Sequence, residues 1–233
     1  MQLLNIFLYF FRKIYYYQLT FMLRIAHRGY SSLYNDNNII SFQKAIEHHF
    51  DIIEMDLQLN SENEIVIFHD NNINNKLLKY VNNKETQEYK LVFFKDFFKN
   101  IDLPKNMKLL LDLKGCDDKL AIILYDFLIN NKINLSQIII GSFNLDYLNY
   151  INKQLFKIPL GFITANNDFN INSFLYNKIK YIIVDITNIS KRKINKLKRH
   201  NKIIFAYTCH NECELELFQN KHLDGIISNI KID

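Results

Sequence analysis

The chain has 233 residues, of which 48% are hydrophobic and 23% charged, and this composition is typical of a globular protein and excludes a disordered one. The length accommodates one domain with a sizeable core, including an α/β barrel. The net charge of +5 is mildly basic, and no nucleic-acid-binding signature accompanies it, so we expect no nucleic-acid partner.

The first 21 residues, "MQLLNIFLYFFRKIYYYQLTF", are apolar and aromatic but are interrupted by Arg12 and Lys13. A membrane-spanning helix needs about 20 predominantly apolar residues, and neither half of this segment provides them. The charges do not precede the apolar run and no small-residue cleavage site follows it, so a secretory signal is not indicated. We predict an N-terminal extension over residues 1–21, with weak membrane contact as an alternative, and one domain over residues 22–233.

After residue 22, short apolar runs alternate with longer segments of helical periodicity. Repeated strand–helix units of this kind form a parallel sheet, and about eight strands in such a length fit a closed (β/α)8 TIM barrel, an α/β fold. The predicted strands are 23–27, 52–59, 64–70, 108–115, 137–142, 159–164, 181–187, 202–208 and 224–228. The predicted helices are 38–49, 92–99, 117–131, 144–153, 171–178, 189–200 and 211–220.

One pair of strands departs from the strand–helix alternation. Between 52–59 and 64–70 there is no room for a helix, which predicts a short β-hairpin at the mouth of the barrel. The following residues, 71–91, are polar and aperiodic, and we predict a loop over the same mouth.

Two predicted strands carry carboxylates near their carboxyl ends, where barrel enzymes place their active sites. Side chains alternate along a strand, so Glu54 and Asp56 share one face. By the same rule Asp112 shares a face with Lys114. Three converging carboxylates repel one another unless positive charge lies among them, and Mg²⁺ or Ca²⁺ prefers such oxygen ligands. A salt-bridged structural cluster is the alternative interpretation.

Two histidines end predicted strands in the same way. His27 is followed by Arg28, and His69 ends the run "IVIFH". Each histidine alone is more typical of a core position, but beside a carboxylate cluster the two are suited to general acid–base catalysis. Arg28 offers a planar donor fork for phosphate oxygens. Together with a metal ion and a lysine, these groups favour phosphate-ester chemistry.

The cysteines indicate the cellular setting. Cys116, Cys209 and Cys213 cannot all pair, which favours a reducing compartment without a disulfide framework. Cys209, His210 and Cys213 are spaced like metal ligands, but no second pair follows, so ordinary structural residues are favoured over a zinc site. We expect a protein that is cytoplasmic or peripherally associated with a membrane.

The order of the motifs resembles that of the glycerophosphodiester phosphodiesterase family, whose members are metal-dependent barrels of the phosphatidylinositol-phospholipase-C-like phosphodiesterase type. The family pattern contains His-Arg-Gly, Glu-x-Asp, His-Asp and acid-x-Lys in this order. The matching segments are His27–Arg28–Gly29, Glu54–Met55–Asp56, His69–Asp70 and Asp112–Leu113–Lys114. The ending "AYTCHNECELELFQNKHLDGIIS" is also similar to that of the family, so the resemblance covers nearly the whole predicted domain.

The resemblance implies hydrolysis of glycerophosphodiesters to sn-glycerol 3-phosphate and an alcohol. Either a neighbouring glycerol hydroxyl or water attacks the phosphate, and the sequence leaves both open. The implied roles are metal binding by Glu54, Asp56 and Asp112, acid–base catalysis by His27 and His69, and phosphate binding by Arg28 and Lys114.

Three departures from the family pattern lie on the predicted pocket wall. Asp112 replaces the usual Glu, Tyr207 the usual Trp and His210 the usual Asn. Because Asp112 is closer to the related sphingomyelinase D-like phospholipases, a phospholipase D-type action on lipid or lysophospholipid headgroups at a membrane surface is the alternative function. A non-catalytic barrel is disfavoured, because sequence drift would not leave all the polar positions of the predicted site intact.

Overall fold

A computed structural model of the chain describes residues 22–115, 119–153, 158–166, 169, 173–219 and 221–232. The predicted extension over residues 1–21 lies outside these residues, and the domain boundary at residue 22 stays a prediction. In the described part of the chain, no helix has both the length and the apolar character needed to cross a membrane.

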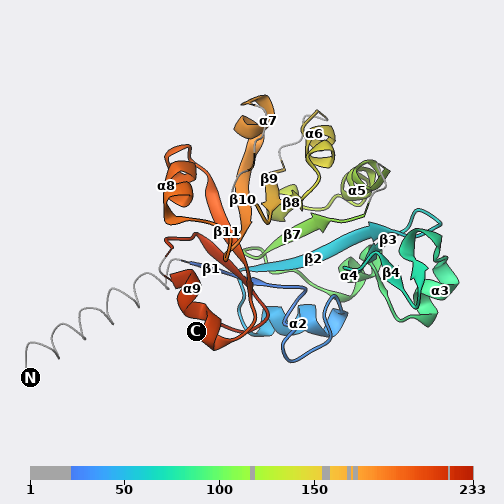
Figure 1. Cartoon of the computed structure of the whole chain (residues 1–233). Coiled ribbons are helices and arrows are strands. Elements are labelled where there is room, and N and C mark those ends of the chain that lie inside the picture. Colours follow the sequence, from blue (N-terminus) through green and yellow to red (C-terminus); the bar gives the residue numbers. More distant parts are fainter. Residues whose placement is uncertain are drawn as a thin grey trace, which may run out of the picture.

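Eight parallel strands close into a barrel within the described residues, because β1 pairs with both β12 and β2. Figure 1 shows the strands of this barrel and the helices outside it. The predicted (β/α)8 fold is therefore confirmed. In barrel order the strands are β1 (Leu23–Ala26), β2 (Ile52–Leu59), β7 (Lys108–Leu113), β8 (Ile138–Ser142), β9 (Leu160–Thr164), β10 (Ile179–Asp185), β11 (Ile203–Cys209) and β12 (Gly225–Ser228).

Helices follow most of the strands and cover the outside of the barrel (Figure 1). They pack their apolar faces on outward-pointing side chains such as Ile53, Met55 and Leu111, which are fully buried in one large hydrophobic cluster. The helices are α2 (Ile39–Glu47), α4 (Phe94–Asn100), α5 (Lys119–Asn130), α6 (Leu145–Lys153), α7 (Ser173–Lys178), α8 (Lys191–Arg199) and α9 (Leu215–Gln219). Single 3-10 turns, η2 (Leu135–Gln137) and η3 (Glu212–Glu214), precede β8 and α9.

A second, smaller hydrophobic cluster fills the inside of the barrel, and we call it the apolar floor. Each strand contributes inward-pointing residues to it, in the alternation expected for a barrel. The apolar floor consists of Ile25, Ile52, Leu110, Ile139, Ile163, Tyr181, Ile183, Phe205 and Ile227.

The predicted hairpin is present, because β3 (Ile65–Ile67) pairs antiparallel with the end of β2. The short strand β6 (Val92–Phe93) pairs with β3 in turn, so the first two residues of the predicted helix 92–99 are extended and α4 begins at Phe94.

The prediction of a loop over residues 71–91 is wrong in part. The segment forms β4 (Asn72–Ile73), β5 (Lys76–Leu77), the 3-10 turn η1 (Leu78–Tyr80) and the helix α3 (Asn83–Glu88). Asn82 and Glu85 form a capping box that begins α3, and the Nζ of Lys76 lies 2.5 Å from Glu85 Oε1. These elements are too short and too polar to show hydrophobic periodicity, and the capping box is the sequence signal that marks α3.

Candidate active site

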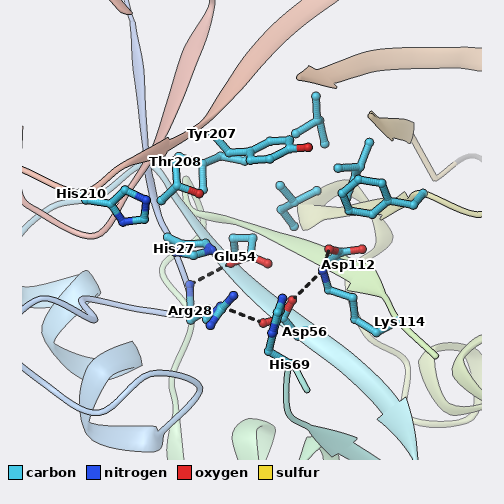
Figure 2. A pocket seen from close by; sticks show the side chains of 15 residues that line it. His27, Arg28, Glu54, Asp56, His69, Asp112, Lys114, Tyr207, Thr208 and His210 are labelled. Atoms are coloured by element: carbon cyan, nitrogen blue, oxygen red, sulfur yellow. Dashed lines mark hydrogen bonds and ion pairs between the residues drawn. The ribbon is translucent and has the colours of Figure 1, made fainter. Parts of the chain in front are cut away.

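A cavity of about 230 Å³ opens at the carboxyl ends of the barrel strands. Four residues of the apolar floor, Leu110, Ile163, Ile183 and Ile227, form part of its lining. The cavity brings together all the site residues predicted from the sequence (Figure 2). These are His27, Arg28, Glu54, Asp56, His69, Asp112 and Lys114.

Three carboxylates form an acidic cluster in this cavity. Glu54 and Asp56 come from β2 and Asp112 from β7, and the strand register places Asp56 beside Asp112. One oxygen of each residue lies within 4.8 Å of the others, and all three residues are buried. This is the convergence predicted from the alternation of the two strands.

The carboxylates of this cluster are held in an unfavourable environment. Burial raises the pKa of Glu54 well above its usual value, and the neighbouring Asp56 and Asp112 raise it further. Burial also raises the pKa of Asp112 to about 7, although Lys114 opposes the shift. The Oδ1 atom of Asp112 is buried without a hydrogen-bond partner. An all-oxygen set of this kind fits a hard divalent cation such as Mg²⁺ or Ca²⁺.

Two cations lie against the same cluster. Lys114 Nζ is 2.6 Å from Asp112 Oδ2 and 3.3 Å from Asp56 Oδ1. Arg28 Nε is 3.2 Å from Asp56 Oδ2. Burial disfavours the charge of Lys114, but the adjacent Asp112 and Asp56 outweigh burial and raise its pKa. Both side chains are mostly buried, with 18% of Lys114 and 21% of Arg28 exposed.

The turn after β1 positions Arg28 through its backbone as well as its side chain. Arg28 and Gly29 have left-handed φ angles of 56° and 80°. This turn directs the Arg28 N–H to Glu54 Oε2 at 2.8 Å, while the Ser41 hydroxyl donates to the Arg28 carbonyl. A Cβ on Gly29 would lie 2.4 Å from Ser41 Oγ, so only glycine fits at this point.

The two predicted catalytic histidines have different partners. His27 Nδ1 lies 2.6 Å from Asn229 Oδ1, and burial, with the charge of Arg28, lowers the pKa of His27 to about 4. His69 Nδ1 lies 2.7 Å from Asp70 Oδ1, and the His69 side chain is 38% exposed. His27 is therefore held neutral in the wall of the barrel, whereas His69 lies at the open side of the cavity beside a carboxylate.

Several residues at the site were not among the predicted site residues, and three of them hold a predicted residue or its segment in place. Asn37 Nδ2 donates to Asp56 Oδ2 at 2.9 Å, and Asn229 contacts His27. Gln58 donates to the carbonyls of residues 68–70 and so fixes the segment that carries His69. Gln58 could have been found, because it continues the alternation of Glu54 and Asp56 along β2.

Comparisons with known proteins point to one family. The model of the glycerophosphoryl diester phosphodiesterase family matches residues 27–79, which include the first three motifs. A predicted glycerophosphodiester phosphodiesterase of Bacillus subtilis, YhdW, is 26% identical over 236 residues, covering 88% of this chain and 93% of the relative.

Solved structures confirm the same fold. A glycerophosphodiester phosphodiesterase from Parabacteroides distasonis superimposes with a TM-score of 0.78 at 19% identity, covering 91% of this chain and 94% of that one. A phosphodiesterase from Oleispira antarctica, solved with its product sn-glycerol-3-phosphate, superimposes with a TM-score of 0.77 at 20% identity, covering 92% of this chain and 96% of that one.

The (β/α)8 barrel of this chain is thus the fold that these solved phosphodiesterases share. The motif order, the family match over residues 27–79 and the relative matched over 88% of this chain agree with one another. The chain is thus similar to the glycerophosphodiester phosphodiesterase family, which is the resemblance that its sequence predicted.

Proposed function

We propose that the protein hydrolyses glycerophosphodiesters to sn-glycerol 3-phosphate and an alcohol with the help of a divalent metal ion, Mg²⁺ or Ca²⁺. The observation that carries this proposal is the convergence of three buried carboxylates, two cations and two histidines on one cavity. The product bound by the Oleispira antarctica phosphodiesterase supports the same substrate class. The partner of the protein is accordingly a small-molecule phosphodiester.

Glu54, Asp56 and Asp112 would hold the metal ion, and their unfavourable burial is the physical support for this role. When bound, the ion would neutralise the carboxylates and polarise the phosphate oxygens. Arg28 and Lys114 lie on both sides of Asp56 and bind the remaining phosphate charge. The guanidinium of Arg28 is suited to a bidentate contact, and Lys114 acts as a point charge.

The two histidines exchange protons with the substrate at Nε2, because their Nδ1 atoms are both engaged. The lowered pKa of His27 keeps it neutral at physiological pH, so it accepts the proton of the attacking hydroxyl. Protonation of the leaving alcohol oxygen then falls to His69, whose Nδ1–H donates to Asp70. Either a glycerol hydroxyl or water fits the role of nucleophile.

A panel of diesters tests this function. Glycerophosphocholine and related diesters are incubated with the purified full-length protein and Mg²⁺, Ca²⁺ or Mn²⁺, and released sn-glycerol 3-phosphate is measured. We expect hydrolysis that EDTA abolishes and that His27→Ala reduces about 10²–10⁴-fold. His200→Ala is the matched control, since His200 is an exposed histidine at the end of α8. A protein inert toward the whole panel with every ion would contradict the proposal.

A phospholipase D-type action on lipid headgroups is the second candidate. The observation that favours it is Phe143, which lines the cavity and is 47% exposed, as expected for contact with an apolar substrate. Lysophosphatidylcholine distinguishes the two functions, because this action releases choline and lysophosphatidate. Weak membrane contact through residues 1–21 also stays a prediction, and loss of a preference for micellar substrates on deleting them would support it.

A further inference from the structure

Three adjacent strand ends place a third histidine beside His27. β11, β12 and β1 are neighbours in the barrel, and their last paired residues lie in one register row. The next residue of each strand is therefore also a neighbour across the rim. These residues are His210, Asn229 and His27, in that order around the barrel.

Asn229 bridges the two imidazoles. Its Oδ1 lies 2.6 Å from His27 Nδ1, and its Nδ2 lies 3.0 Å from His210 Nδ1. Its backbone is fixed on both sides, because its N–H donates to the carbonyl of Cys209 and its carbonyl accepts from Ser32 N–H. Both histidines line the cavity, and Figure 2 shows them on the same side of it.

The amide group of Asn229 determines where the two rings carry their protons. The amide oxygen only accepts a hydrogen bond and the amide nitrogen only donates one. His27 must therefore donate from a protonated Nδ1, and His210 must accept at an unprotonated Nδ1. In its neutral form His210 then carries its proton on Nε2.

We propose that Asn229 is a positioning residue that sets opposite tautomers of His27 and His210. His27 keeps its Nδ1–H bond whether or not it is charged, so its proton exchange takes place at Nε2. His210 presents Nε2–H as an additional donor to a hydroxyl or phosphate oxygen of the substrate. The part of the proposal that concerns substrate rests on the proposed function, whereas the tautomers do not.

Nitrogen-15 NMR of the histidine-labelled full-length protein tests the tautomers without any assay of activity. We expect His27 protonated at Nδ1 and His210 protonated at Nε2. In Asn229→Ala, His27 should change to the Nε2–H form that free imidazole prefers. Asn131→Ala is the matched control, since Asn131 is an exposed asparagine that donates to the carbonyl of Phe127. Wild-type His27 protonated at Nε2 would overturn the proposal even if Asn229→Ala did not fold.

Kinetics separate the two halves of the bridge. Asn229→Ala should lower kcat about 10–100-fold, as loss of a residue that orients a functional imidazole does. His210→Ala should raise KM about fivefold, the effect of one lost hydrogen bond. Asn229→Asp keeps the acceptor for His27 but lacks the donor for His210. Its kcat should therefore be close to that of wild type, and its KM should be raised as in His210→Ala.

The outcomes remain distinguishable from those of the proposed function. An inert wild type with the expected tautomers would contradict the function and leave the bridge standing. An active wild type in which Asn229→Ala has the kcat of Asn131→Ala would overturn the positioning role.

Discussion

The apolar floor and the acidic cluster lie two residues apart on the same strands, yet burial has opposite energetic effects on them. We call the acidic cluster together with Arg28 and Lys114 the rim. On β2, Ile52 belongs to the apolar floor and Glu54 to the acidic cluster, with 2% and 4% of their surfaces exposed. On β7, Leu110 and Asp112 repeat the arrangement, at 0% and 4%. Burial, strand and inward direction are shared, and only the chemistry of the side chains differs.

This comparison separates the residues that stabilise the fold from those proposed to perform the chemistry. A buried leucine or isoleucine stabilises the fold by about 1.5–3 kcal/mol, whereas a buried carboxylate costs free energy unless it is paired. The raised pKa values of Glu54 and Asp112 express that cost. The acidic layer therefore adds no burial energy of this kind, which agrees with the metal-binding role proposed for it.

The largest expected effect is a loss of activity from a substitution that changes the acidic cluster and leaves the apolar floor intact. Glu54→Gln should reduce the turnover of glycerophosphocholine about 10³-fold or more, because a metal ion supplies several kcal/mol of transition-state stabilisation. The amide oxygen still accepts from the Arg28 N–H, so the turn after β1 is preserved. Steady-state kinetics with Mg²⁺ or Ca²⁺ measures the loss.

The control for this substitution is Glu47→Gln, on an exposed turn of α2. Thermal unfolding of Glu54→Gln should occur at the wild-type temperature or above it, since a neutral amide is easier to bury than a carboxylate. A strongly destabilised Glu54→Gln would show that the cluster is structural, which is the alternative interpretation of the sequence.

The second prediction breaks the floor on the same strand. Ile52→Ala removes a fully enclosed side chain and should lower the free energy of unfolding by about 2–5 kcal/mol. At a temperature where the variant is folded, its kcat should remain far closer to wild type than that of Glu54→Gln. Urea denaturation and kinetics on one preparation test both halves, and an equal loss of activity would remove the distinction between the two layers.

Much of the barrel could be predicted because each strand carries its own signal. A run such as 181–187 is apolar and β-branched, which indicates a strand. Alternation along a strand also shows which side chains share a face, and Glu54 and Asp56 on β2 are the clearest case. Residues 71–91 carry no such signal, since α3 begins at a capping box of Asn82 and Glu85 rather than on an apolar face. Hydrophobic periodicity does not detect elements as short as α3.

The parts of the candidate site that follow from alternation within a strand could be predicted. Contacts that depend on the register between two strands could not. The acidic cluster follows from alternation within β2 and β7. The contact of Asn229 with His27 depends instead on the register of β12 against β1, which hydrogen bonds between distant segments determine. The residues of neither strand specify that register on their own, so the contact between Asn229 and His27 could not be predicted from the sequence.

The third prediction concerns the pH dependence of the rim. Asp112 has a pKa of about 7 in the folded protein against an ordinary 3.8, so the folded state binds this proton more tightly. Its contribution to stability is present at low pH and is lost as the pH rises from about 4 to about 7. Metal-free protein in EDTA should therefore show a falling free energy of unfolding over this window.

Asp112→Asn removes the titrating group and should flatten that fall relative to wild type. Added Mg²⁺ or Ca²⁺ competes with the proton and should offset the loss most strongly above pH 7. Urea denaturation at several pH values measures all three curves. Parallel curves for wild type and Asp112→Asn would show that Asp112 does not titrate in this window.

The smallest expected difference is the one between alanine variants of two glycines that follow barrel strands. Gly29 and Gly115 both have left-handed φ angles, 80° and 75°, so alanine at either costs about 1–2 kcal/mol of backbone strain. At Gly115 the nearest atom to a new Cβ is 3.5 Å away, whereas at Gly29 it is Ser41 Oγ at 2.4 Å, with the Ser41 backbone at 2.8 Å. Gly29→Ala should therefore cost about 1–3 kcal/mol more in urea denaturation. It should also lower activity by displacing Arg28, while Gly115→Ala should not. Equal costs would mean that the turn after β1 relaxes freely, and the position of Arg28 would then depend on its ion pair with Asp56 rather than on the backbone.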